Sequence, residues 1–323
     1  MTDHRSRRRW TAAGLAVCLA AAVAGCGSDN LPAGDREVTI VATTTILGDV
    51  ARRVAADDAV VEVLLPLGAD PHDYRASARQ VAAMRSADLV IANGLDLEEG
   101  LLDVLEGLEA DGANVLRLAP LLSPIPFAGG GLDPHVWFDP LRMADAAGLI
   151  AGELQDLQPA SDWTGRADAY AAELAGTDLD ITGLLSSVPA DQRSLVTNHD
   201  SLGYLADRYG YEVVGTVIPG GSTLAEPSSA ALTELVGIID SSGVAAIFAE
   251  TTDNADLADA IAAEIDREVA VIELYTGSLG EPGSGADTLI GMLLTNARRV
   301  TQALDGSPSG GSAAATVGGT WTG

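Results

Sequence analysis

The chain has 323 residues, of which 47% are hydrophobic and only 4% aromatic, and its formal net charge is −28. This length is sufficient for two domains with a sizeable core, and the small share of aromatic residues suits a layered α/β protein. The charge excludes nucleic acid as a partner, because phosphates require a basic surface, and we interpret most acidic residues as a solvated face.

The first 25 residues are predicted to be an export leader. Four arginines between positions 5 and 9 precede an apolar stretch at 11–24 that is too short to span a bilayer as a stable helix. Small residues lead directly to Cys26 and polar residues follow it, which resembles a bacterial lipobox. We therefore expect a lipid on Cys26 and a tether over 26–36 that holds the protein to the outer face of the cell membrane. The alternative is a plain secretory leader.

Two similar halves are predicted after the tether, at 37–140 and 191–304. Each alternates apolar strand-like runs with segments of helical period. The expected strands are 37–43, 59–67, 88–92, 114–118, 193–197, 212–218, 244–249 and 269–274. The expected helices are 46–56, 77–86, 97–110, 201–209, 228–240, 255–265 and 287–304. Strands joined by crossover helices form parallel sheets, so we predict an α/β fold with two parallel-sheet lobes.

The segment 141–190 is predicted to link the halves. It is rich in Ala, Leu, Glu and Asp and has a helical period, although Pro159 must break the helix. A helical joint restricts how far two lobes can swing, unlike a Gly/Ser linker. The final segment, 305–323, is rich in Gly and Ser and is expected to be disordered.

Three histidines follow the predicted leader, and each stands in a loop beside an acidic residue. His72 follows the strand predicted at 59–67, His199 ends the first strand of the second half, and His135 lies between elements. The tripeptide Asp-Pro-His occurs twice, and proline stiffens the approach to the imidazole. A single such histidine is more simply a surface residue. Three together favour a shared site for a transition metal, because imidazole suits zinc, copper, nickel and iron.

Seven motifs, in order, resemble the zinc- and manganese-binding solute-binding lipoproteins of ABC importers, a group that includes adhesin-like surface proteins. They are VATTT at 41–45, GADPHDY at 68–74, ADLVIANG at 87–94, DPHVW at 133–137, HDSLGY at 199–204, AEPS at 225–228 and GSGADT at 283–288. The similarity runs from about Val38 to Leu304. No single motif is decisive, but together they are highly specific.

The resemblance implies two (βα)4 lobes bridged by a long helix, with a metal between the lobes. It implies that His72 and His135 are ligands from the first lobe and that His199 is the first ligand of the second lobe. The resemblance further implies an extracytoplasmic monomer that captures a metal without catalysis and delivers it to an ABC permease. Histidine at position 199, where manganese-preferring relatives tend to have a carboxylate, favours Zn²⁺; Mn²⁺ is the alternative.

The sequence departs from the family at the fourth ligand. The aspartate expected after the last strand corresponds to Gly277, which has no side chain. Water, Glu250 or Glu281 is a candidate replacement, and the other possibility is that the chain binds metal weakly or not at all. Asp200 and Glu250, and also Asp73, are candidates for orienting the imidazoles, although each is equally consistent with a helix cap.

Two functions of other classes compete with metal capture. A zinc hydrolase or lyase also uses three histidines and an open position, but no general base is clearly placed in the sequence. A surface adhesin that has lost metal binding is the second alternative, and it is motivated by Gly277.

Overall fold

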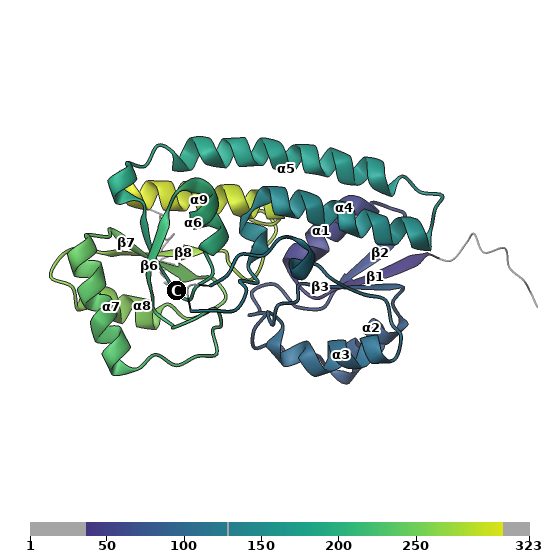
Figure 1. Cartoon of the computed structure of the whole chain (residues 1–323), viewed down its shortest axis with the longest axis horizontal. Coiled ribbons are helices and arrows are strands. Elements are labelled where there is room, and N and C mark those ends of the chain that lie inside the picture. Colours follow the sequence, from purple (N-terminus) through teal and green to yellow (C-terminus); the bar gives the residue numbers. More distant parts are fainter. Residues whose placement is uncertain (1–36, 128, 306–323) are drawn as a thin grey trace, which may run out of the picture. The chain divides into compact units, whose positions relative to one another are not determined.

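Two four-stranded parallel sheets form the framework of the protein in a computed structural model (Figure 1). The structure describes residues 37–127 and 129–305. The predicted leader, Cys26, the tether up to residue 36 and the tail from residue 306 lie outside the described residues. Among the described residues, no helix has the length and apolar character needed to cross a membrane.

The first sheet has the strand order β2-β1-β3-β4. Its strands are β1 (Val38–Ala42), β2 (Ala59–Val63), β3 (Leu89–Ala92) and β4 (Val115–Arg117). The central strand β3 is buried at every position, as expected for a parallel strand covered on both faces. Helix α1 (Thr45–Ala55) covers one face, and α2 (Ala78–Ser86) and α3 (Leu102–Ala110) cover the other (Figure 1).

The second sheet repeats this plan with the order β6-β5-β7-β8. Its strands are β5 (Ser194–Thr197), β6 (Glu212–Thr216), β7 (Ala246–Glu250) and β8 (Ala270–Leu274). Its helices are α6 (Gly203–Tyr209), α7 (Ser229–Ser242), α8 (Asp256–Ala263) and α9 (Leu289–Leu304). The strand order reverses between the two central strands of each sheet, β1 and β3 in the first and β5 and β7 in the second. The loops that follow the strands at such a point are where open α/β sheets bind ligands.

Two helices link the sheets, α4 (Pro140–Leu157) and the longer α5 (Trp163–Leu185). Pro159 lies in the turn between them, so the predicted break is confirmed. The two helices pack side by side, and α5 also packs against α1 and α9, which makes it the helix shared by both lobes (Figure 1). One continuous cluster of buried apolar side chains therefore runs from the first lobe through α4 and α5 to the second.

The predicted two-lobe α/β class is confirmed, with shifts at the element ends. The largest shifts are at the start of α3, which begins at Leu102 instead of residue 97, and at the end of β2, which lies at Val63 instead of residue 67. Pro66 explains the early end of β2, because proline has no N–H to donate to a neighbouring strand. Helix starts follow capping chemistry: the Thr44 side chain accepts from the Leu47 N–H at the start of α1, and Ser77 and Gln80 form a capping box at the start of α2.

Candidate metal centre

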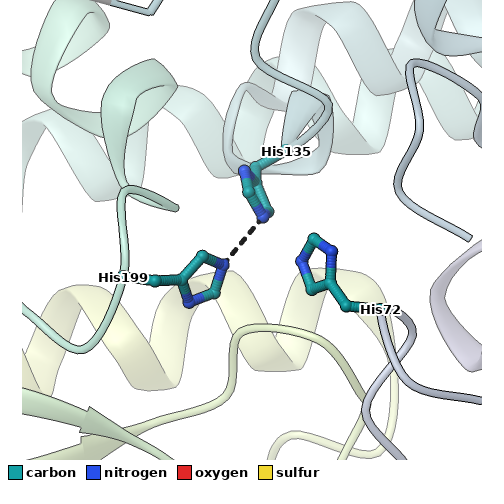
Figure 2. Close-up of side chains that lie close together, drawn as sticks. All are labelled: His72, His135 and His199. Carbon is teal, nitrogen blue, oxygen red and sulfur yellow. Dashed lines mark hydrogen bonds between the residues drawn. The ribbon is translucent and has the colours of Figure 1, made fainter. Parts of the chain in front are cut away.

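The three histidines meet in the interior of the protein (Figure 2). His72 lies in the loop after β2, His199 is the second residue after β5, and His135 stands at the start of the short 3₁₀ helix η3 (Val136–Phe138). One ring nitrogen from each lies within 4.8 Å of the others, and the Nε2 atoms of His135 and His199 are 3.1 Å apart. All three residues are at most 3% exposed. Three ring nitrogens that could bind one metal ion therefore lie around one point.

Both Asp-Pro-His loops use the same local structure. Asp70 Oδ1 accepts the backbone N–H of His72 at 2.9 Å, and Asp133 Oδ1 accepts that of His135, also at 2.9 Å. This is the aspartate turn in which the side chain binds the backbone two residues on. The turn fixes the backbone of each histidine before any metal is present.

The two loops differ in their second contact. Asp133 Oδ1 also lies 2.7 Å from Nδ1 of His135, which leaves Nε2 of that imidazole for a metal. Asp70 instead accepts a hydrogen bond from Thr223 Oγ1 through Oδ2 at 2.5 Å, which ties the first lobe to the loop after β6. Neither ring nitrogen of His72 has a hydrogen-bond partner among the described residues.

Glu250 orients the third imidazole. It is the last residue of β7, is 2% exposed, and its Oε1 lies 2.6 Å from Nδ1 of His199. Thr276 Oγ1 donates to Oε2 at 2.7 Å and Ser201 Oγ donates to Oε1 at 3.3 Å. A carboxylate on one imidazole nitrogen fixes the ring and makes the other nitrogen the metal-facing one.

The electrostatics divide the histidines into two kinds. Burial, with the neighbouring imidazoles, lowers the pKa of His72 to about 2 and that of His135 well below its ordinary value, so both rings are neutral. Burial also opposes a charge on His199, but Glu250 overcomes it and raises the His199 pKa. Burial acts to raise the pKa of Glu250 as well, but His199 and the Thr276 hydroxyl lower it overall. His199 and Glu250 therefore form a buried ion pair beside two neutral imidazoles.

Gly277 lies in the loop after β8 and faces the first lobe. A Cβ atom added to Gly277 would lie 2.7 Å from Cδ and 3.2 Å from Cγ of Pro71. Both residues line the same enclosed cavity as the three histidines, Trp137 and Glu250, and that cavity is too tight to admit a free water molecule. The Pro71 ring therefore occupies space that a side chain at position 277 would need.

The structure separates the other candidate residues. Glu250 joins the histidines, whereas Glu281 is exposed in the turn before α9 and Asp73 is exposed beside His72. The backbone N–H of Asp200 donates to the Gly220 carbonyl, and its side chain does not line the cavity. Asp133 was missed by sequence reasoning, although its place two residues before His135 in a repeated motif was a usable signal.

Comparison with protein families gives a match over residues 40–303. The matching family is described as zinc-uptake complex component A, periplasmic. The match begins inside β1 and ends inside α9, so it includes both sheets and all three histidines.

Two relatives illustrate the similarity. The chain is 29% identical over 285 residues to the manganese-binding lipoprotein MntA of Halalkalibacterium halodurans, covering 87% of this chain and 93% of MntA. It is 30% identical over 280 residues to the zinc-binding protein TroA of Treponema pallidum, covering 84% of this chain and 90% of TroA. The solved structure of TroA superposes with a TM-score of 0.78 and 29% identity, covering 83% of this chain and 99% of that structure.

Proposed function

Since the chain belongs to the family of periplasmic zinc-uptake proteins called component A, we propose that it captures zinc outside the cytoplasm and delivers it to an ABC permease. Proteins of this family are metal-binding components of ABC importers and not enzymes. The proposal therefore concerns the metal that this chain selects, the residues that bind it and the protein that receives it.

The observation that carries the proposal is the convergence of three buried imidazoles from two lobes. Zinc bound by nitrogen at about 2.05 Å in a tetrahedron requires ligand atoms about 3.3 Å apart. The 3.1 Å between Nε2 of His135 and Nε2 of His199 lies close to that separation, and His72 completes the group. We therefore assign His72, His135 and His199 as the metal ligands.

The donor set supports zinc over manganese. Three imidazole nitrogens form a borderline-soft site, whereas manganese prefers carboxylate and other oxygen donors. The resemblance implies an aspartate ligand at position 277, where this chain has glycine, so the oxygen donor that would favour manganese is missing from the proposed site. Manganese remains the second candidate because the relatives include the manganese-binding lipoprotein MntA.

Glu250 is the carboxylate best placed to support the metal in place of the missing aspartate. It lines the cavity and holds His199, whereas the side chains of Asp200 and Glu281 do not line it. In this role Glu250 acts through His199, since its Oε1 atom lies 2.6 Å from the imidazole nitrogen that faces away from the other histidines.

Membrane attachment is a further part of the proposal. The lipobox-like motif supports a lipid on Cys26, and the named relatives include lipoproteins. A lipid at that position would keep the metal-binding lobes close to a permease in the same membrane. Replacing Cys26 by serine should release the protein from the membrane fraction without changing its affinity for zinc.

Thermal unfolding of the chain without its leader, after chelation and after addition of zinc or manganese, tests metal capture. A ligand that binds only the native state raises stability by RT ln(1 + [L]/Kd), about 2.7 kcal/mol at one hundred times Kd. We expect a large shift with zinc, a smaller one with manganese, and loss of the zinc shift in His199→Ala. If neither metal shifts the midpoint, the chain has kept the fold without the function.

Delivery requires a separate assay. Membrane vesicles that contain the cognate permease should take up zinc only when the metal-loaded protein is present on the outer side. Metal binding without such uptake would remove the permease from the proposal and leave metal capture in place.

A further inference from the structure

A second, open pocket adjoins the enclosed histidine cavity from outside. Its volume is about 290 Å³, which holds several water molecules. The loop after β2, the 3₁₀ helix η1 (Glu99–Leu101), the start of α3 and Leu224 from the second lobe form its walls. We call this pocket the vestibule.

The vestibule carries a net negative charge. Asp73, Glu99 and Asp103 line it together with a single cation, Arg75, so its lining has a formal charge of −2, from three carboxylates and one guanidinium. Asp73, Asp103 and Arg75 are exposed, and the Glu99 side chain is 35% exposed. These charges face water, where a hydrated cation can approach them.

His72 belongs to both the vestibule and the enclosed cavity. It is 3% exposed, and its Nδ1 lies 3.7 Å from Oε1 of Glu99 without a hydrogen-bond partner among the described residues. A buried imidazole nitrogen without a partner is costly unless something binds it part of the time. The ring therefore connects the acidic pocket to the cluster of three ligands.

The second lobe borders the same pocket. Ser222 Oγ donates to Oε1 of Glu99 at 2.5 Å, and Leu224, two residues later, is 50% exposed and lines the vestibule. The enclosed cavity is too tight for a free water molecule, so an entering ion must displace part of its wall. The hydrogen bond from Ser222 to Glu99 joins the second lobe to a residue that lines the vestibule.

We propose that the vestibule is an entry site that holds a hydrated divalent cation at Asp73, Glu99 and Asp103 before His72 takes it inward. This inference rests on the proposed function, because it describes how the same metal reaches the same ligands. Acidic surfaces with this geometry raise the local cation concentration and the association rate, with an effect that salt screens.

The test is the rate constant for zinc association to the full mature chain, measured by stopped-flow fluorescence. The matched variants are Asp73→Asn/Asp103→Asn in the vestibule and Asp168→Asn/Asp180→Asn on the exposed face of α5. Each pair removes two negative charges. We expect the vestibule pair to slow association about four-fold at low salt, about two-fold for each charge, and the difference to shrink at high salt. The α5 pair should change the rate less than two-fold.

Arg75→Gln provides a test of opposite sign, because removing the single cation should speed association about two-fold. Thermal unfolding without metal shows whether each variant is folded, and the single variants Asp73→Asn and Asp103→Asn replace the pair if it is not. Equal rates for the two pairs, or slower association in Arg75→Gln, would overturn the entry site while leaving zinc capture intact. Failure of the unaltered chain to bind zinc would instead refute the proposed function.

Discussion

Replacing Gly277 by alanine should weaken zinc binding, because the added methyl group pushes Pro71. The new Cβ would lie 2.7 Å from Cδ of Pro71, whereas ordinary contacts begin at 3.4 Å, so 3.4 − 2.7 gives a required shift of 0.7 Å. The proline ring is rigid and His72 is the next residue, so much of that shift reaches one of the proposed ligands. Metal sites keep ligand distances within about 0.2 Å, so the affinity should fall ten-fold or more. Overpacking should also cost about 1–3 kcal/mol of stability.

Zinc affinity by competition with a chromophoric chelator and stability by denaturant unfolding measure both effects. Gly237→Ala is the matched control, because nothing lies within 4 Å of a Cβ at that exposed position of α7. Alanine there should leave affinity unchanged and stabilise the helix by about 0.5–1 kcal/mol. An alanine at position 277 that changed neither quantity would refute the packing argument.

The same reasoning predicts that Gly277→Asp, which introduces the aspartate that the resemblance implies, does not supply a fourth ligand. The aspartate carries the same Cβ and therefore meets the same ring. Pairing Gly277→Asp with Pro71→Ala removes Cγ and Cδ, and this pair should recover affinity that the single change loses. A double-mutant coupling of about 0.5–3 kcal/mol is expected for residues in contact. Tighter zinc or manganese binding in Gly277→Asp alone would contradict the argument.

Three more outcomes follow from the contacts around the histidines. Glu250→Gln should weaken zinc binding about 10- to 100-fold, because it removes the charged partner of His199; an unchanged chelator-competition curve would show that the pair is only structural. The pKa of His199 is raised and that of Asp133 is about 7, while His72 and His135 are neutral, so zinc should displace between one and two protons in acidic solution. The logarithm of affinity should therefore rise by one to two per pH unit while both groups are protonated and level off once both have lost their protons, and a slope near three in a pH titration would contradict this reasoning. Thr223→Val should speed zinc loss to a chelator roughly two- to ten-fold, because it removes the hydrogen bond to Asp70 across the lobes, and an unchanged rate would mean that this contact does not limit opening.

The fold was predictable from sequence because its signals are local. Short apolar runs separated by helical spacing are sufficient to predict parallel strands with crossover helices, and all eight expected strands are present. The exact ends of the strands and helices depended on features that the pattern of apolar residues did not contain. The strand predicted at 244–249 is Ala246–Glu250, so Glu250 ends the strand instead of following it, and its side chain is aimed by the strand itself.

The candidate site was predictable only in part, because some of its contacts join residues close in sequence and others join residues far apart in the chain. The repeated Asp-Pro-His motif is local, and it pointed to His72 and His135 and contained the turns made by Asp70 and Asp133. The contact of Thr223 with Asp70 joins residues 153 positions apart, and no local pattern encodes it. The same holds for Pro71 against Gly277, because the resemblance implied a ligand position without a side chain but gave no sign of the ring that lies beside it.

The negative charges of the proposed site lie on Glu250 and Asp133, which contact His199 and His135, and not on the proposed ligands themselves. Without metal, His199 and Glu250 neutralise each other, and burial raises the pKa of Asp133 to about 7, so that carboxyl holds a proton part of the time at neutral pH. A divalent ion bound by three neutral imidazoles would displace the proton of His199 and lower the pKa of Asp133, since a nearby cation favours the charged carboxylate. Glu250 and Asp133 together then supply two negative charges, which match the ion without any carboxylate in contact with it. In such a site the charge of the metal ion is balanced without an aspartate at position 277. The nitrogen donors then determine which metal the site prefers.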